Sequence, residues 1–180
     1  MKPVMRPIVL SSALLLAHAV PAFSAELPSR KPGLWEVKTS IENVNAPARI
    51  VKQCIDAATD QMLQSIAGPF NPASCPERNV QSSANSTTID FKCTVGGKPA
   101  TAHSLITGSL DSAYTLIVTS RSDEIAGGGM TMTMEGKWLG ACAADQKPGD
   151  IVMSNGVKIN VPELQKRSLS TIPLTPGESR

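Results

Sequence analysis

Hydrophobic and polar residues alternate along most of the chain, which is the pattern of β-strands with one buried and one solvated face. In "LWEVKTSI" (residues 34–41), Trp35, Val37, Thr39 and Ile41 share one face, while charged and polar residues share the other. The same alternation, or a run rich in β-branched residues, recurs in later segments. These further strands are predicted at residues 49–55, 87–95, 100–107, 113–121, 130–142 and 151–160.

One segment instead has a helical period. Ala58, Met62, Leu63 and Ile66 recur at helical spacing, and a glycine follows them as a stop signal. We therefore predict one short amphipathic helix over residues 57–67, with Met62 and Leu63 packed against the sheet.

Turns rich in glycine or asparagine separate the strands. The segment "GGKP" (residues 96–99) is predicted to be a tight turn and not a phosphate cradle, because no helix follows it. Asn155–Gly156 between two apolar stretches indicates a type I′ hairpin. Residues 71–79 and 122–129 are predicted to be loops, and Pro162 is expected to begin a short helical segment.

The expected fold is mainly β. Seven or eight short strands joined by tight turns are typical of an antiparallel meander. A strongly curved sheet or partly closed barrel, with the helix covering one face, would protect the sheet edges. A β-sandwich is the alternative architecture.

The stretch "GGGMTMTMEGKW" (residues 127–138) places a row of methionines on one face of a strand. Met130, Met132 and Met134 alternate with threonine and charged residues, and Trp138 continues their face. Because the opposite face is polar, the methionine face is expected to be buried, where each methionine contributes about 1.5–3 kcal/mol. The candidate core or ligand-facing residues are therefore Trp35, Val37, Ile41, Met130, Met132, Met134 and Trp138.

Metal binding and catalysis have little support in these residues. Thioether sulfurs are soft ligands suited to Cu(I), so Met130, Met132 and Met134 are a minority candidate for a copper site. His103 is the one histidine after residue 25, and its strand pattern predicts an ordinary strand residue. The motifs G-x-S-x-G, H-E-x-x-H and S-x-x-K do not occur in a supporting context. No cofactor and no enzymatic activity are expected.

The N-terminal segment has the three parts of a secretory signal peptide. Lys2 and Arg6 form a short basic start, residues 8–20 are apolar, and small residues follow up to Ala25. The apolar run is too short to cross a bilayer, which needs about 20 residues. The expected organisation is a signal peptide at residues 1–25, a single β-rich domain at 26–168 and a flexible C-terminal tail at 169–180.

Removal of the signal peptide would leave a nearly neutral chain. A cut after Ala22, Ser24 or Ala25 fits the small-residue rule equally well. Loss of Lys2 and Arg6 reduces the 17 basic residues to 15, against 15 acidic ones. The basic residues are scattered, which argues against nucleic-acid binding and against a membrane-surface role. We expect an exported, periplasmic monomer whose partner is a small apolar ligand or another envelope protein.

Four cysteines lie after the signal peptide, and their spacing contains no C-x-x-C motif. An even number of cysteines in an exported chain is typical of structural disulfides, and four cysteines allow three pairings. A hairpin that turns near Ala84 would place Cys75 opposite Cys93. Cys54 would then pair with Cys142. The sequential pairing, in which Cys54 joins Cys75, remains open.

Three segments carry a resemblance to a known family. They are "LPSRKPGLWEVKTS", "VKQCIDAATDQML" and "MTMTMEGKWLGACAADQKPGDIVMSNGVKINVPEL", and together they resemble the small exported bacterial proteins of domain-of-unknown-function family 3617, from Leu27 to Leu164. The resemblance implies a periplasmic, Gram-negative setting, a single β-rich domain and disulfide-bonded cysteines. It implies no catalytic residue and no ligand. Gly33 and Trp35 also match the Gly-x-Trp of lipocalin barrels, although a tryptophan that covers a core explains this two-residue match equally well.

These features favour a non-catalytic binding module in which a curved sheet holds a lipid or another small apolar molecule on its concave face. The alternative is a structural or interaction protein of the cell envelope, with a filled core and a partner docked on an edge strand or on the helix. The two classes differ in whether the interior is filled, which the sequence pattern does not determine.

Overall fold

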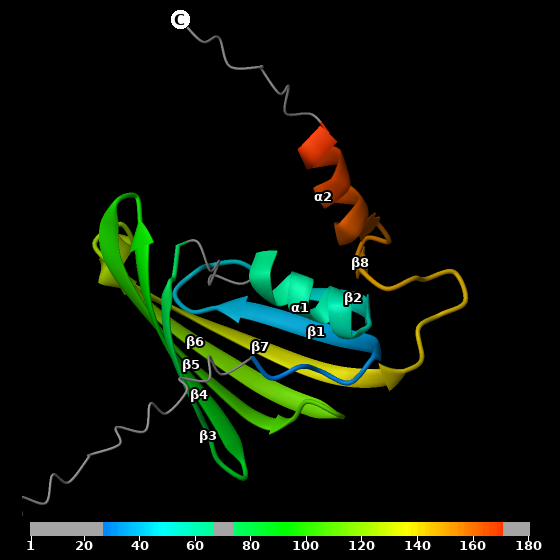
Figure 1. Cartoon of the computed structure of the whole chain (residues 1–180), viewed down its shortest axis with the longest axis horizontal. Helices are drawn as coiled ribbons and strands as arrows, with labels where there is room; N and C mark the ends of the chain where they lie inside the picture. Colours follow the sequence, from blue (N-terminus) through cyan, green and yellow to red (C-terminus); the bar gives the residue numbers. More distant parts are fainter. Residues whose placement is uncertain (1–26, 67–73, 171–180) are drawn as a thin grey trace, which may run out of the picture.

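The computed structural model describes residues 27–66 and 74–170, and within these ranges the fold is mainly β. Nine antiparallel strands form one sheet, one short α-helix lies over it, and a second extends from its end (Figure 1). The strands are β1 (Gly33–Ile41), β2 (Arg49–Ile55), β3 (Glu77–Ser82), β4 (Ser86–Val95), β5 (Lys98–Ser109), β6 (Ala113–Ser122), β7 (Gly129–Gly140), β8 (Asp150–Met153) and β9 (Lys158–Asn160). The helices are α1 (Ala57–Ile66) and α2 (Val161–Ser170), and a 3-10 turn covers Ala126–Gly128.

The strand order is β3-β4-β5-β6-β7-β1-β2-β8-β9, and the sheet does not close. Only β3 to β7 follow each other as the predicted meander. The β1–β2 hairpin lies between β7 and β8, so β1 has a neighbour on both sides. This correction has a physical basis, because alternation shows which side of a strand is buried and does not show which strands pair.

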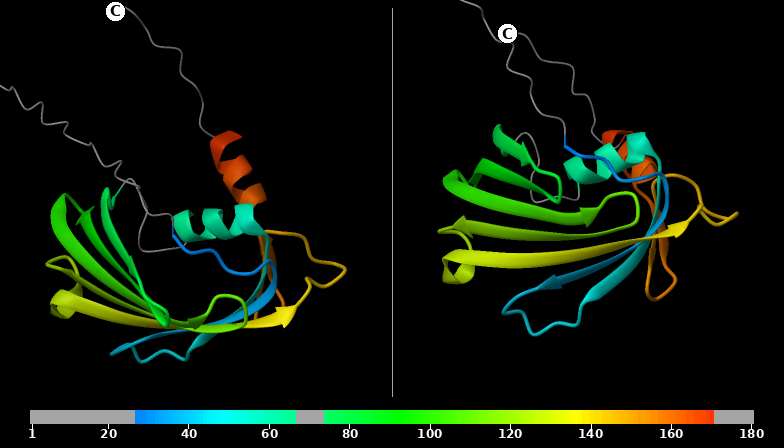
Figure 2. Two further views of the ribbon diagram at one scale, coloured as in Figure 1. Left: turned by 60° about the horizontal axis from the view of Figure 1, so that its bottom comes forward. Right: turned by 90° about the horizontal axis from the view of Figure 1, so that it is seen from below.

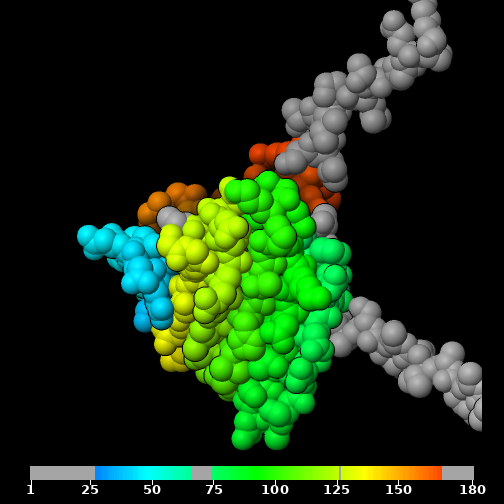
Figure 3. Space-filling view, turned by 90° about the vertical axis from the view of Figure 1, so that its left-hand side faces the viewer, coloured from blue at the N-terminus to red at the C-terminus, as the bar shows by residue number. Residues whose placement is uncertain are grey.

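The sheet bends around one side, and α1 lies over the concave side of the bend (Figure 2). Strands β3 to β7 lie side by side as a continuous surface in the space-filling view, and the turn between β1 and β2 projects beyond them (Figure 3). Helix α2 follows β9 directly and lies at the opposite end of the sheet from β3.

The strand registers align rows of side chains across the concave face. Met132 lies opposite Val118, Val118 opposite Ser104, and Ser104 opposite Ile89. A neighbouring row contains Met134, Leu116 and Ile106. Directly opposed residues in an antiparallel sheet point to the same face, so these rows form one apolar surface that spans β4 to β7.

The core on this face consists of two clusters. The buried members of the first cluster, at the end near α1, are Trp35, Val37, Ile55, Leu63 and Tyr114. The buried members of the second, at the end near β3, are Cys75, Ile89, Phe91 and Ala102. Ile106 is partly buried and contacts both clusters, so it is a link between them.

The predicted hairpin at Asn155–Gly156 is present, but its turn type is different. Gly156 has a φ of +83°, whereas Asn43 is the one non-glycine residue with positive φ in the described part of the chain. Asn155 therefore does not adopt the left-handed conformation that a type I′ turn needs at both central positions. Instead the Asn155 side-chain oxygen accepts a hydrogen bond from the backbone N–H of Val157 at 3.1 Å, which stabilises a longer loop.

The hairpin near Ala84 joins β3 to β4, although the sequence prediction assigned residues 77–79 to a loop. Polar residues occur on both faces of β3, so this segment lacks the alternation of apolar and polar residues that predicts a strand. Pairing with β4 stabilises its strand conformation instead. The structure joins Cys75 to Cys93 and Cys54 to Cys142. This is the pairing that follows from the hairpin, and the sequential pairing is not present.

Helix α1 begins as predicted but buries a different face. Leu63 is buried, as expected, and so are Thr59 and Asp60, whereas Ala58 is exposed. Helix α2 continues to Ser170, two residues into the range expected to be tail. The predicted signal peptide and most of that tail lie outside the described residues.

Candidate binding site

The segment before β1 is organised by two tryptophans. Trp35 donates an indole hydrogen bond to the carbonyl of Lys31 at 2.8 Å, and Trp138 donates to the carbonyl of Pro32 at 3.1 Å. The ammonium of Lys31 lies 3.8 Å from the Trp138 ring centroid, within cation–π range. Gly33, with φ +133°, fits here because a Cβ would lie 2.4 Å from the carbonyl oxygen of Gly140. These contacts fix the chain that carries Arg30.

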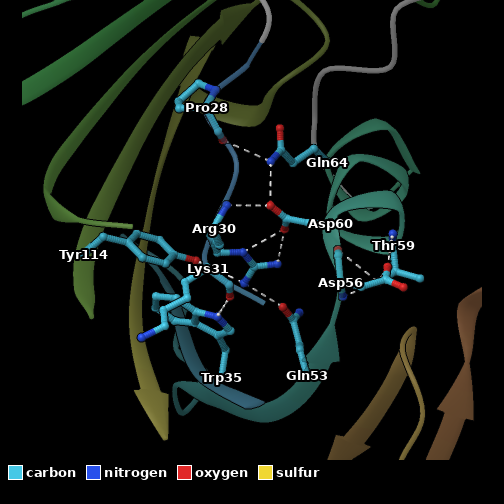
Figure 4. A network of polar contacts seen from close by, with 10 residues as sticks. All are labelled: Pro28, Arg30, Lys31, Trp35, Gln53, Asp56, Thr59, Asp60, Gln64 and Tyr114. Atoms are coloured by element: carbon cyan, nitrogen blue, oxygen red, sulfur yellow. Dashed lines mark hydrogen bonds and ion pairs between the residues drawn. The ribbon is translucent and has the colours of Figure 1, made fainter. Parts of the chain in front are cut away.

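Arg30 and Asp60 form a buried ion pair between this segment and α1 (Figure 4). The Arg30 side chain is 9% exposed and the Asp60 side chain 0%. Arg30 Nε and Nη2 donate to Asp60 Oδ1 at 2.9 and 2.7 Å, and the Arg30 backbone N–H donates to Oδ2 at 2.8 Å. The carboxylate therefore neutralises the guanidinium and ties the helix to the strand entry.

Three further polar side chains complete this network. Arg30 Nη1 donates to Gln53 Oε1 at 2.9 Å and approaches the Tyr114 hydroxyl at 3.4 Å. The Gln64 amide donates to Asp60 Oδ2 at 3.1 Å and to the carbonyl of Pro28 at 3.2 Å (Figure 4). Buried charge is costly unless it is paired and hydrogen-bonded, and this network provides both conditions.

A capping box holds the first turn of α1. The backbone N–H of Thr59 donates to Asp56 Oδ1 at 2.8 Å, and the backbone N–H of Asp56 donates to Thr59 Oγ1 at 2.9 Å. These hydrogen bonds satisfy donors that the helix start leaves unpaired. The hydrogen bond from Thr59, together with its hydroxyl, lowers the pKa of Asp56 below its ordinary value of 3.8. The cap therefore fixes the turn that presents Asp60.

Tyr114 connects the polar network to the apolar core. Its ring lies 5.6 Å from the ring centroid of Trp35 and occupies the space above Gly136, where a Cβ would lie 2.1 Å from the tyrosine ring. Burial raises the pKa of Tyr114 above 10.0, and the nearby Arg30 partly opposes this shift. The phenol therefore remains a neutral hydrogen-bonding group at physiological pH.

An apolar hollow lies between the concave face and α1, and this polar network forms one end of it. Its cavity volume is about 160 Å³, and it is partly open to solvent. A cavity of about 150 Å³ in an engineered protein holds a benzene ring, so the enclosed part of this hollow is ring-sized. Its lining consists of Leu27, Pro28, Arg30, Gln53, Leu63, Gln64, Ile89, Phe91, Ser104, Ile106, Leu110, Tyr114, Leu116, Val118, Met132 and Met134.

Ser104 is the exception within the apolar part of this lining. It is 1% exposed, and its hydroxyl has no hydrogen-bond partner in the described part of the chain. Its neighbours across the strands, Ile89 and Val118, are apolar and buried. A buried hydroxyl without a partner is costly, and such groups call for an explanation.

The methionine row faces the concave side, in the predicted phase. Met130, Met132 and Met134 are half-buried, and the last two line the hollow. Met132 and Met134 are thus part of the wall of the hollow, and Met134 also packs against the first core cluster. The sequence pattern could not distinguish a hollow from a filled core, because it shows the face and not what lies opposite it.

The other residues predicted to form the core differ in how deeply they are buried. Trp35 and Val37 are 0% and 1% exposed, and Trp138 is half-buried. Ile41 is 38% exposed, which corrects the expectation that it belongs to the core. It lies opposite Met132, beyond the point where β2 stops pairing with β1, and therefore lacks a covering neighbour on that side.

His103 points away from the methionine row. It lies on the opposite face of the sheet, where its Nδ1 is 2.7 Å from Asp90 Oδ1 and its side chain is 54% exposed. A copper site built on the methionines would therefore not include this histidine. Groups of three or more His, Cys, Asp or Glu side chains that could hold a metal are absent from the described ranges.

The polar residues of the site were not identified from the sequence. Arg30 precedes the first strand pattern, and Asp60 lies on the predicted helix near Leu63, which gave a weak signal that a carboxylate faces the sheet. Ser104 carried the clearest signal that was missed. It occupies an apolar phase in "ATAHSLIT", with Ala102 two residues before it and Ile106 two residues after it.

The fold and the hollow together define a small, mainly β domain whose single antiparallel sheet and one helix enclose an apolar hollow with a buried ion pair at one end. The chain belongs to the family described as "Protein of unknown function (DUF3617)", whose model matches residues 30–142 of the 180. This finding confirms the resemblance found in the sequence. The three segments that carried the resemblance contribute Arg30, Asp60 and Met132 to the hollow lining or its ion pair.

Comparison with curated proteins and with solved structures found no match. Among the residues that the structure describes, no helix is long and apolar enough to cross a membrane. The paired disulfides are typical of proteins in oxidising compartments.

Proposed function

We propose that this protein is a non-catalytic binding module that holds a lipid chain or another small apolar molecule in the hollow. The single observation that carries this proposal is the hollow with an apolar lining, to which both core clusters contribute residues. A domain of this size normally fills its interior to high density, so a hollow lined by leucine, isoleucine, valine and methionine requires a reason. Binding sites for small molecules are commonly apolar with few polar groups.

The surroundings of the hollow favour a preformed site. The ion pair between Arg30 and Asp60 ties α1 to the sheet, and the disulfide between Cys54 and Cys142 joins β2 to the segment after β7. A wall that is already ordered in the free protein lowers the entropy that is lost when the ligand binds. Met132 and Met134 add flexible thioether side chains, which adapt to ligands of different shape.

We also propose the setting in which the module acts. The N-terminal pattern and the disulfides support export to the periplasm, with residues 1–25 removed and the rest forming one domain. The bend of the single open sheet supports a strongly curved, half-barrel architecture in preference to a sandwich. The module is proposed to act as a monomer.

Native mass spectrometry of the mature protein, purified from the periplasm of its own host, tests the proposal. The expected result is a mass excess that is released by organic solvent and matches a small apolar molecule. The remaining polypeptide mass also reports the cleavage site and a loss of four hydrogens for two disulfides.

Two adjacent residues on β6 provide a matched pair of variants. Leu116→Trp places an indole in the hollow, whereas Ile117→Trp places the same group on the opposite face, where Ile117 is 37% exposed. We expect Leu116→Trp to lose the bound mass and Ile117→Trp to keep it. If Leu116→Trp unfolds the domain, Met132→Phe is the milder variant that fills the same space.

Other outcomes would support the alternatives. A bare polypeptide in the wild type, together with co-purifying envelope protein, would support a structural or interaction protein. A mass excess equal to copper that Met132→Leu removes would support Cu(I) handling by Met130, Met132 and Met134. Either result would overturn the apolar-ligand proposal.

A further inference from the structure

We infer that the hollow selects an uncharged ligand that carries a hydrogen-bonding oxygen on an aliphatic body, and that Ser104 is the residue that binds this oxygen. The inference rests on the proposed function, because it names the chemical class of ligand for the same hollow. The oxygen of a ketone, an ester or an alcohol fits this description, whether it belongs to a lipid or to a smaller metabolite.

The first argument for a ligand oxygen is the position of Ser104. Ser104 is 1% exposed and lines the hollow, and its hydroxyl has no hydrogen-bond partner within the described ranges. The side chains of its cross-strand neighbours Ile89 and Val118, and of Met132 on the far side of Val118, carry no oxygen or nitrogen. A ligand oxygen in the hollow would satisfy this group, and a pure hydrocarbon would leave it unsatisfied.

The charge of the hollow carries the second step. Among the described residues, Arg30 is the one charged side chain on the lining, and Asp60 already neutralises it through contacts at 2.7–2.9 Å. A ligand carboxylate would therefore lose its hydration without gaining a free positive partner. The remaining polar groups at that end, Gln53, Gln64 and Tyr114, are neutral side chains.

The spacing of the polar groups sets the ligand's shape. Tyr114 lies four residues along β6 from Val118, the residue opposite Ser104. At about 3.4 Å per residue, roughly 14 Å separate the two positions along the strand. Ser104 thus lies in the apolar middle of the face, far from the polar end, so the ligand oxygen needs aliphatic groups on both sides.

Three probes that share a six-membered carbon ring test the inference on the full chain: cyclohexane, cyclohexanone and cyclohexanecarboxylate. Their binding is followed by NMR of the ¹³C-labelled methyl groups of Met132 and Met134. The variants are Ser104→Ala, which removes the hydroxyl, and Ser104→Thr, which retains it. Ser120→Ala is the matched control, because Ser120 is a half-buried serine on the same face of the adjacent strand and outside the lining.

We expect Ser104→Ala to weaken cyclohexanone binding by about threefold to tenfold, the range for one neutral hydrogen bond, with cyclohexane unaffected. Ser104→Thr and Ser120→Ala should retain the affinity for the ketone. Cyclohexanecarboxylate should bind more weakly than cyclohexanone in the wild type. Because Ser104→Ala removes an unsatisfied group, the variant should fold at least as stably as the wild type.

The experiment distinguishes failure of the proposed role of Ser104 from failure of the proposed function. If cyclohexane and cyclohexanone both shift the methionine signals and Ser104→Ala changes neither affinity, the role of Ser104 is wrong and the apolar site stands. If the carboxylate binds most tightly, the selection for uncharged ligands is wrong. If none of the three probes shifts the signals, the proposed function fails together with the inference.

Discussion

Arg30 and Asp60 show how single residues outside the hydrophobic pattern can determine the geometry of a site. Their charges are buried, yet each is hydrogen-bonded by the other or by neutral amide and hydroxyl groups. Such a pair contributes little net stability compared with apolar packing, but removal of one partner leaves an uncompensated buried charge. The residues therefore fix how α1 approaches the sheet.

The first prediction concerns this pair. Asp60→Ala should lower the free energy of unfolding by about 3–5 kcal/mol, because Arg30 then keeps a buried charge without its counter-ion. Urea denaturation at neutral pH measures the effect. The control is Lys38→Ala, which breaks the exposed pair with Glu135 (side chains 50% and 54% exposed) and should cost less than about 1 kcal/mol. Recovery of most of the loss in Arg30→Met/Asp60→Leu would support the explanation, and equal losses in Asp60→Ala and Lys38→Ala would contradict it.

A second prediction concerns Tyr114, which is the one tyrosine in the chain. The ultraviolet absorbance of tyrosinate therefore reports this residue alone. We expect an apparent pKa above 10.0, because burial disfavours the phenolate. In Arg30→Met the pKa should rise further, because the positive charge that favours the phenolate is removed.

The raised pKa of Tyr114 also determines how the free energy of unfolding depends on pH. A raised pKa means that the folded state keeps its proton longer than the unfolded state. The stability that Tyr114 contributes is fully present below pH 10.0 and decreases as the pH rises through the folded pKa of Tyr114. Tyr114→Phe should lack this alkaline decrease. A wild-type titration at or below 10.0 would show that the ring is not buried as described.

At the scale of elements, α1 depends on its cap as much as on its apolar face. The periodicity of residues 57–67 predicted the helix, but the capping box between Asp56 and Thr59 determines where it starts. The buried face then includes Asp60 and Thr59 beside Leu63, because the ion pair with Arg30 holds that side of the helix toward the sheet.

The third prediction tests the cap. Asp56→Ala should cost about 0.5–2 kcal/mol at neutral pH, since the first-turn donors lose their acceptor. The lowered pKa of Asp56 means that its contribution is present above pH 3.8 and is lost as the pH falls through the lower folded value. Asp56→Asn should keep most of the stability, because asparagine also caps helices, but without that acid dependence. Denaturation curves at neutral and acidic pH distinguish the two variants, and an uncapped Asp56→Ala with wild-type stability would exclude the role.

The strands show what the alternation of apolar and polar residues predicts correctly and what it misses. Alternation predicted β1, β4, β5, β6 and β7, because each has one apolar face. It missed β3, in which Val80 is the one apolar residue and which is ordered by pairing with β4. The Asn–Gly dipeptide also predicted the wrong turn type at Asn155–Gly156, where a side-chain hydrogen bond to Val157 stabilises a longer loop than the type I′ turn would allow.

At the scale of the whole molecule, the disulfides connect segments far apart in the chain. Cys54 and Cys142 are 88 residues apart in sequence, and Cys75 and Cys93 are 18 apart. The first bridge joins β2 to the segment after β7, and the second joins the start of the β3–β4 hairpin to β4.

The fourth prediction compares these bridges. Chain-entropy arguments give about 4.6 kcal/mol for the longer loop and about 3.2 kcal/mol for the shorter one. Cys54→Ala/Cys142→Ala should therefore reduce the free energy of unfolding by about 1.4 kcal/mol more than Cys75→Ala/Cys93→Ala. Urea denaturation of the two double variants measures the difference. A larger loss for the hairpin bridge would indicate that local packing at Cys75, and not loop closure, dominates.

Local sequence alone predicts which face of each amphipathic strand is apolar and where α1 lies, and it offered the hairpin that brings Cys75 to Cys93 as one of the pairings left open. These features depend on residues close together in the chain, whose period and turn chemistry act locally. The folded molecule, by contrast, was needed to show that β1 pairs with β7, that Arg30 meets Asp60 and that the methionine face lines a hollow. Those outcomes depend on which distant segments come into contact, and a local pattern carries no information about what lies opposite an apolar face.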